Sequence, residues 1–166
     1  MNELHKKLKE KFPDDVLGTH EQHGDETAVI KPSALLRVAQ FLRDNADYDM
    51  SFLMDLTAVD GSKLGWNPRF QVVYHFYSLN KNHRLRIKVP AADGGSVSSL
   101  TGLWAVANWF ERECWDLFGI QFEGHPNLRR IMMYEGFVGH PLRKDYPINR
   151  RQPLIGPGAI KTEAAK

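Results

Sequence analysis

Residues 70–89, FQVVYHFYSLNKNHRLRIKV, decide the fold class of this chain. The first half, residues 70–78, is rich in Val, Tyr and Phe, which are the side chains that favour β-strands. In residues 84–89 apolar and basic side chains alternate, which is the pattern of a half-buried strand with a basic outer face. The sequence Asn-Lys-Asn at 80–82 is typical of a turn between them. These residues therefore predict an antiparallel hairpin.

The segments on either side of the hairpin add helices and further strands. Residues 2–12 carry apolar side chains at every fourth position, which predicts a short helix that ends before Pro13. A second helix is expected to begin around Pro32 and to end near Asn45. Residues 27–30 and the apolar residues 51–60 are strand candidates, and we expect the second of these strands to be buried. The expected fold is an α+β two-layer domain over residues 1–147, with helices packed on one antiparallel or mixed sheet.

A third helix should begin at Ser98 or Ser99 and run to a C-terminal cap at Gly119. At about 100° per residue, Glu111 falls in the middle of its apolar face, whereas Arg112 and Asp116 fall on the opposite face. We expect Glu111 to be a buried structural charge, held by an arginine or by N–H donors, or else to reach the surface. After Gly119 we expect short strands and turns, and an extended partner-binding tail over residues 148–166, which is rich in Pro and Gly.

Composition places the chain among ordinary soluble globular proteins. Its 166 residues are 42% hydrophobic and carry 22 basic and 20 acidic side chains, for a net charge of +2. A single cysteine, Cys114, cannot form an internal disulfide, and on an apolar stripe it is typical of an inert thiol. The N-terminal residues lack the apolar run of a secretory leader, and no apolar run reaches the roughly 18 residues that span a bilayer.

Charged and aromatic residues are densest in residues 109–147, WFERECWDLFGIQFEGHPNLRRIMMYEGFVGHPLRKDYP. Acidic and basic side chains alternate there, which suits a charge-matched protein interface better than a track for phosphates. The histidines do not have the compact spacing of a zinc site, and the chain has no phosphate-binding glycine loop. We therefore expect no catalytic, cofactor-binding or metal-binding residue. The expected partner interface consists of Trp109, Arg112, Glu113, Asp116, His125, Arg129, Arg130, His140, Arg143, Lys144 and Asp145.

This stretch resembles the signature of the 30-kilodalton subunit family of respiratory complex I (NADH:quinone oxidoreductase). The resemblance rests on the run Glu-Arg-Glu at 111–113, then Asp116, Leu117, Phe118, His125, Arg129 and Ile131. The run Gly-His-Pro-Leu-Arg-Lys-Asp-Tyr-Pro at 139–147 resembles the second block of the family. Together the two blocks cover about forty residues.

The resemblance implies a structural and assembly protein without a redox centre. Such a protein packs against the hydrogenase-related subunit, which helps form the quinone site, and against other subunits of the hydrophilic arm. It is peripheral, on the cytoplasmic side of the inner (plasma) membrane, and reaches the membrane only through the complex. NADH, FMN, the iron–sulfur clusters and quinone are expected on other subunits, and no nucleic acid is expected as a partner.

Three alternatives remain open from the sequence. The chain can be the equivalent component of a related membrane-bound hydrogenase or quinone-reducing complex. It can be a small basic nucleic-acid-binding domain, which would use the basic side chains of residues 129–151. It can also be a stand-alone acid–base enzyme that uses Glu111 with a histidine.

Overall fold

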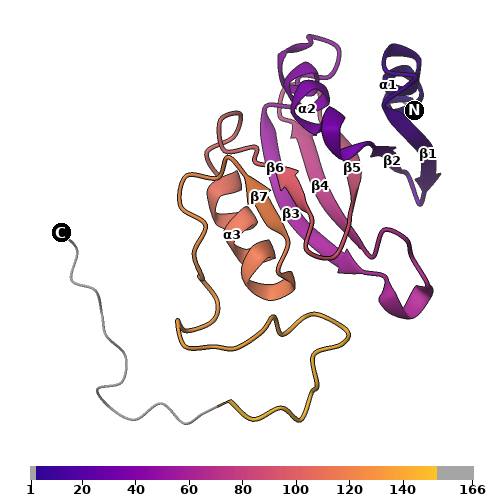
Figure 1. The fold of residues 1–166 in the computed structure, drawn as a ribbon. Helices are drawn as coiled ribbons and strands as arrows, with labels where there is room; N and C mark the ends of the chain where they lie inside the picture. Colours follow the sequence, from indigo (N-terminus) through magenta and orange to yellow (C-terminus); the bar gives the residue numbers. More distant parts are fainter. Residues whose placement is uncertain (1–2, 153–166) are drawn as a thin grey trace, which may run out of the picture.

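The computed structural model describes residues 3–152 of the chain, and these form one α+β domain (Figure 1). Its main sheet contains β1 (Val16–Gln22), β2 (Asp25–Ile30), β3 (Phe52–Asp60), β4 (Phe70–Ser78) and β5 (His83–Ala91). The order across the sheet is β1-β2-β5-β4-β3. Strands β2 and β5 run parallel and the other neighbours run antiparallel, so the sheet is mixed.

The expected hairpin forms the centre of this sheet. Strands β4 and β5 pair antiparallel from Phe70 opposite Ala91 to Ser78 opposite His83. The apolar residues of β5 face the core, because Leu85, Ile87 and Val89 are almost fully buried. The alternation in the sequence therefore predicted both the pairing and the buried face.

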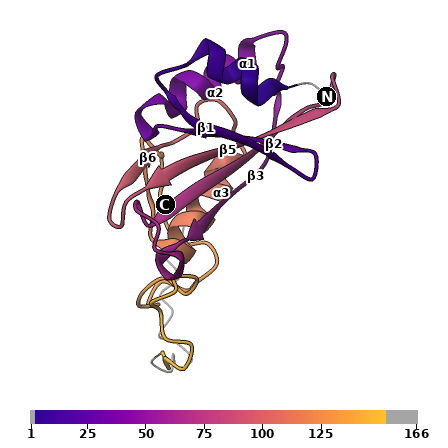
Figure 2. The same ribbon diagram turned by 90° about the vertical axis from the view of Figure 1, so that its right-hand side faces the viewer.

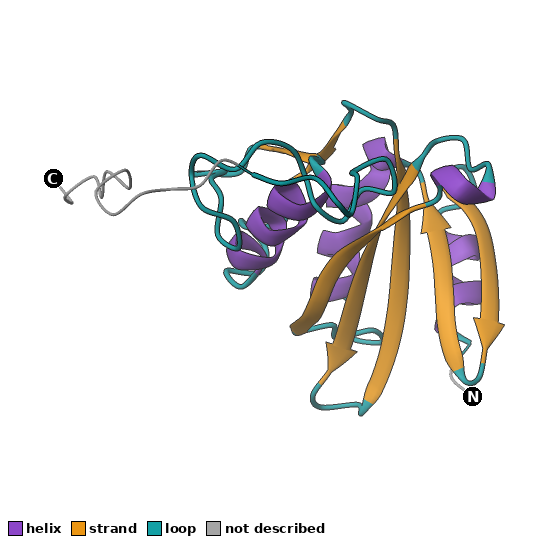
Figure 3. Cartoon of the chain, turned by 90° about the horizontal axis from the view of Figure 1, so that it is seen from below, coloured by secondary structure: helices purple, strands orange, loops and turns teal. Residues whose placement is uncertain are grey.

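The helices α1 (Leu4–Lys11), α2 (Leu35–Asp44) and α3 (Ala107–Phe118) lie on one face of the sheet, as Figures 2 and 3 show. Two short 3-10 helices, η1 (Pro32–Ala34) and η2 (Ser62–Leu64), complete the helical elements of the described chain. The core between the layers includes the stacked rings of Tyr74 and Phe76, whose centroids are 6.1 Å apart. The opposite face of the sheet carries no helix of the described chain.

Two expectations about the elements need correction, and one strand was not expected. Residues 16–22, for which the sequence predicted no strand, form the edge strand β1, which pairs with β2 alone. Strand β3 is half-buried rather than buried, with Phe52 45% and Val59 39% exposed. The third helix begins at Ala107 instead of Ser98 or Ser99, because residues 96–98 form strand β6, which pairs in parallel with β7 (Gln121–Glu123).

The end of α3 agrees with the sequence. Gly119 adopts a left-handed conformation with φ 82°, and its N–H donates to the carbonyl of Trp115 at 2.8 Å. The expected short strand follows as β7. A β-carbon at Gly119 would lie 2.7 Å from the ring of His140, so the close approach of the later chain also requires glycine here.

Candidate functional site

The candidate site consists of α3 and the loop segment, which we define as residues 124–152. After Glu123 the described chain has no further helix or strand, and the loop segment runs beside α3 (Figure 1). A backbone without regular structure must find its hydrogen-bond partners elsewhere. Two groups of charged side chains supply them, and we name each after its buried carboxylate.

The Asp116 group attaches the middle of the loop segment to α3. One carboxylate oxygen of the fully buried Asp116 accepts the backbone N–H groups of Ile131, Met132 and Met133 at 3.0, 2.8 and 2.9 Å. The other oxygen accepts a hydrogen bond from the Arg130 guanidinium. Burial by itself raises the pKa of Asp116, but these donors outweigh it and hold the pKa below its usual range. The carboxylate thus replaces the acceptors that a strand would have provided.

Two arginines extend this attachment. Arg130 also donates to the carbonyls of Phe137 and Gly139 at 2.9 and 3.0 Å, and so closes the chain into a loop around its guanidinium. Arg112 of α3 donates to the carbonyls of Arg129 and Arg130, both at 3.2 Å, and its guanidinium lies 5.1 Å from the centre of the Trp109 ring. The five-donor fork of arginine suits it to holding several carbonyls at once.

The two histidines of the signature blocks, His125 and His140, make hydrogen bonds with the backbone of turns and of α3. His125 contacts the carbonyl of Asn108 through Nε2 at 3.1 Å, while its Nδ1 accepts the N–H of Asn127 at 3.0 Å. The ring of His125 therefore links the turn at 125–127 to α3. His140 contacts the carbonyl of Asp116 through Nδ1 at 2.9 Å.

The Asp60 group attaches the end of the loop segment to the sheet. Arg69 donates to both oxygens of Asp60, at 3.0 and 2.6 Å, and to Asp93 and Asp145 at 2.9 and 2.8 Å. Arg143 donates to both oxygens of Asp93 at 2.9 and 2.6 Å, and its Nε donates to Asp145 at 3.2 Å. The N–H of Lys144 donates to Asp60 at 2.8 Å. Hydrogen bonding from Arg69 holds the pKa values of Asp60 and Asp145 far below their usual range.

Three of these residues were not predicted from the sequence: Asp60, Arg69 and Asp93. Each occurs next to the end of a predicted strand or in the following loop, where a charged residue is common. Their partners lie far along the chain, and the Arg69–Asp145 pair joins positions 76 residues apart.

Glu111 is buried as expected, but among the described residues it has no arginine partner. One of its oxygens accepts the N–H of Leu100 at 2.6 Å. The other is buried without a hydrogen-bond partner in the described chain, as are the hydroxyl of Tyr74 and the indole N–H of Trp104. Burial raises the pKa of Glu111 to about 7. Burial also raises the pKa of Cys114, so its thiol stays protonated, in agreement with an inert cysteine.

The predicted interface residues fall into three classes by exposure. The expectation that Arg112 and Asp116 lie on an outward face and contact a partner is wrong for this chain, because the loop segment covers both side chains. His125, Arg130, His140 and Arg143 are half-buried and bind the chain itself. The exposed members are Trp109, Glu113, Arg129, Lys144 and Asp145.

Large apolar side chains stand exposed beside these charges. Trp109 is 58% exposed, Met132 57%, Val138 53% and Leu142 47%. Isolated surface apolar residues are ordinary, but here several occur on one short irregular segment that is held in place by buried ion pairs. The arrangement can present a fixed apolar surface with a charged surround.

The tail begins within the loop segment. Gln152 donates to the carbonyl of Val138 at 3.0 Å and to the hydroxyl of Tyr146 at 2.6 Å, so the first residues of the expected tail contact the domain. The rest of that tail, residues 153–166, lies outside the described residues.

Two further findings concern only residues 3–152. These residues contain no group of three or more His, Cys, Asp or Glu side chains placed to hold a metal ion. Within the same range, no helix has the length and apolar character needed to cross a membrane.

Comparison with known proteins identifies the class of protein. Residues 28–152 match the family described as "Respiratory-chain NADH dehydrogenase, 30 Kd subunit". A protein of Geotalea uraniireducens that is named as a subunit of NADH-quinone oxidoreductase is 45% identical over 153 residues, which cover 90% of this chain and 91% of the relative. The protein of the same name from Citrifermentans bemidjiense is 47% identical over 153 residues, covering 90% and 92%.

Solved structures agree on the fold. A structure described as the trypsin-resistant fragment (1-134) of Nqo5 superposes with a TM-score of 0.65 at 28% identity, covering 77% of this chain and 100% of the fragment. A chain of the membrane-bound sulfane sulfur reductase, an archaeal respiratory membrane complex, gives a TM-score of 0.70 at 19% identity, covering 89% and 85%. The second likeness concerns the fold alone.

The α+β fold and the charged loop segment are thus those of a component of a respiratory-chain oxidoreductase. The chain belongs to the 30-kilodalton subunit family of respiratory-chain NADH dehydrogenase, the family that contributes one subunit to the NADH-quinone oxidoreductase complex. Its partners therefore include other subunits of complex I.

Proposed function

We propose that this chain is a non-redox subunit that positions the hydrogenase-related subunit near the quinone site, and that it does so through α3 and the loop segment. It has no active site of its own in this proposal. NADH, FMN, the iron–sulfur clusters and quinone act on other subunits, and the chain lies on the cytoplasmic side of the membrane as a peripheral part of the complex.

One observation carries the proposal. Two signature charges, Asp116 and Arg130, are already used in holding the loop segment: Asp116 accepts four donors, and Arg130 binds two carbonyls in addition to it. Glu111, the third candidate for acid–base chemistry, is fully buried. The exposed side chains of α3 and the loop segment include the large apolar Trp109, Met132, Val138 and Leu142 among charged ones, and such a mixture occurs in protein interfaces. A group of this kind supports binding, since a contact surface that is already ordered loses less entropy on association.

Affinity purification of the hydrogenase-related subunit from detergent-solubilised membranes tests this proposal. The double variant Val138→Asp/Leu142→Asp places two carboxylates on the exposed apolar surface of the loop segment without touching its buried ion pairs. Leu64→Asp is the matched control, because Leu64 is 69% exposed on η2 and belongs to neither group. We expect the control chain to be recovered with the hydrogenase-related subunit and the double variant to be lost. Recovery of the double variant at the level of the control would refute the proposed contact.

The absence of a redox role has a separate test. Metal analysis and an absorption spectrum of the purified full chain should show no stoichiometric iron, zinc or flavin. A bound chromophore or metal at one equivalent would contradict the non-redox assignment while leaving the contact with the hydrogenase-related subunit untouched.

A further inference from the structure

The face of the main sheet turned away from the helices has two chemically different sides. Strand β3 places Phe52 and Val59 on this face, and Met54 stands at the bulge of the same strand; their side chains are 45%, 39% and 44% exposed. Strand β5 places the row Arg84, Arg86 and Lys88 on this face, two strands away. A mainly apolar row on the edge strand β3, which Asp55 and Thr57 interrupt, and the basic row on the central strand β5 therefore run alongside each other with β4 between them.

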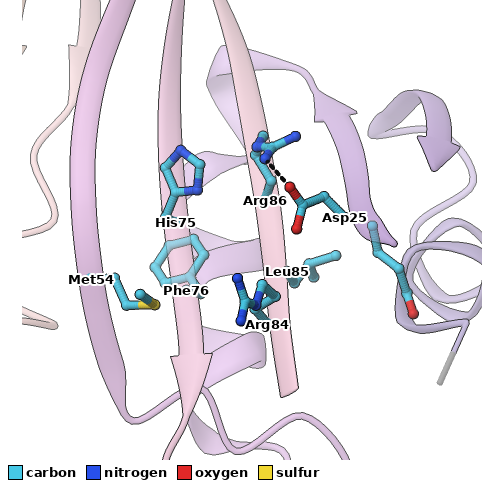
Figure 4. A pocket seen from close by; sticks show the side chains of 8 residues that line it. Asp25, Met54, His75, Phe76, Arg84, Leu85 and Arg86 are labelled. Atoms are coloured by element: carbon cyan, nitrogen blue, oxygen red, sulfur yellow. Dashed lines mark hydrogen bonds and ion pairs between the residues drawn. The ribbon is translucent and has the colours of Figure 1, made fainter. Parts of the chain in front are cut away.

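The basic row is only partly neutralised by the chain itself. Arg86 donates to Asp25 at 2.8 Å, as the dashed line in Figure 4 shows. Arg84 and Lys88 have no ion-pair partner among residues 3–152. Burial, and to a lesser extent the neighbouring Arg86, lowers the pKa of Lys88. Arg84 and Lys88 are thus cations without a carboxylate partner in the described chain.

A shallow pocket joins the two sides. It has a volume of about 200 Å³ and lies where Met54, His75 and Arg84 approach one another across three strands (Figure 4). Such a depression accepts one or two side chains of a bound protein, whereas it is small for a cofactor, whose sites typically measure about 300–1,000 Å³.

We propose that this sheet face is a second docking surface that binds an amphipathic helix of a neighbouring subunit. One side of that helix is apolar and the other side is acidic. The spacing supports a helix: β3 and β5 are two strand separations apart, roughly 10 Å, which matches the diameter of an α-helix with its side chains. A helix lying along β4 touches Phe52 and Val59 on one side and Arg84 and Lys88 on the other. It also completes the layer that the sheet lacks.

Charge decides between this occupant and others. A second copy of the same face would set the basic row against either another basic row or the mainly apolar row of β3, and neither arrangement pairs the cations with a row of carboxylates. The phosphate backbone of a nucleic acid is bound by cations alone. On this face the carboxylates of Asp25 and Asp55 would repel it, and the apolar row of β3 would make no favourable contact with it. An amphipathic acidic helix can contact the apolar row of β3 and pair with the basic row of β5 at the same time. The inference requires only that the chain is part of complex I, and it does not rest on the contact with the hydrogenase-related subunit proposed above.

A photo-crosslinking experiment in the assembled complex tests the occupant. Benzoylphenylalanine replaces Phe52, and the same label at Leu36 serves as control, because Leu36 is 47% exposed on the helical layer. We expect the label at 52 to link to a peptide of another subunit with carboxylates at helical spacing and apolar residues between them. A link to lipid, to a second copy of this chain or to a peptide without carboxylates would overturn the proposal, as would no link at all.

Charge reversal tests the role of the basic row on β5. The double variant Arg84→Glu/Lys88→Glu should be retained in the purified complex about tenfold less than the wild type, with the deficit largest at low ionic strength. Lys63→Glu/Lys81→Glu, on exposed loops at the ends of the strands, is the matched control and should be retained normally. Circular dichroism and thermal melting of each free chain check that the variant is folded. Retention equal to that of the control would overturn the proposal, whatever the result for Val138→Asp/Leu142→Asp.

Discussion

Asp116→Asn is the substitution that most directly tests how the loop segment is held. Asparagine has nearly the shape of aspartate but no charge, and only one of its two terminal atoms can accept. If its oxygen accepts the N–H groups of residues 131–133, its NH2 group is directed at Arg130, which is also a donor. The substitution therefore leaves a guanidinium that is only 16% exposed without its carboxylate.

The expected loss follows from these contacts. Breaking a buried ion pair by removing one partner costs about 3–5 kcal/mol. The lower end applies here, because Arg130 retains the carbonyls of Phe137 and Gly139 and the backbone bonds are weakened rather than lost. We therefore expect a loss of about 3 kcal/mol, which corresponds to roughly a hundredfold change in an equilibrium constant.

Hydrogen exchange is the appropriate assay, because the loop segment can detach from α3 without unfolding the sheet. In the variant, the amides of Ile131, Met132 and Met133 should lose about a hundredfold in protection, while amides of β4 change little. Glu113→Gln is the control, since Glu113 is exposed on the same helix and should change stability by less than about 0.5 kcal/mol. Unchanged protection of these three amides in Asp116→Asn would refute the reasoning.

Three further outcomes are expected. Because the folded-state pKa of Glu111 is raised from 4.5 to about 7, its contribution to stability is complete below pH 4.5 and is lost as the pH rises through 7; Glu111→Gln should flatten this slope in urea titrations at a series of pH values. Gly119→Ala should lower the melting temperature measurably, because it combines a left-handed backbone with a β-carbon 2.7 Å from His140, whereas Gly102→Ala, with open space around it, should not. Deleting residues 153–166 should leave the melting temperature of the free chain nearly unchanged but weaken its association with the hydrogenase-related subunit, as measured by co-purification; wild-type recovery would show that these residues are dispensable for the contact.

The main sheet could be predicted because its signals are local. The strict alternation in residues 84–89 allows only one buried face, and the turn at 80–82 fixes which strand it pairs with. The start of α3 could not be predicted in this way. Residues 98–106 continue the apolar stripe of the helix, but Ser96–Ser98 gain a strand partner in β7 that lies more than twenty residues away. Long-range pairing overrode a local pattern that was equally good.

That residues 109–147 form a partner interface stays a prediction, and the contacts within this stretch could not be predicted from the sequence. Helical phase alone assigned Asp116 to an exposed face. Helical periodicity identifies only one buried side of a helix, namely the side that contacts the sheet. In this chain the loop segment covers a second side of α3. Asp116 lies on that side and accepts the backbone N–H groups of residues 131–133.

The buried charges of the signature replace the hydrogen-bond partners that a helix or a strand would give to the backbone. Every polar backbone group that leaves water needs a partner, and helices and strands supply those partners by repetition. The loop segment has neither, so Asp116 collects three successive N–H groups, while Arg112 and Arg130 together collect four carbonyls. The segment therefore does not need helical or strand geometry, and Met132, Val138 and Leu142 are exposed on it. Neutral substitutions at the buried charges should therefore impair binding through loss of loop structure, whereas substitutions at the exposed apolar residues should impair binding with the loop intact.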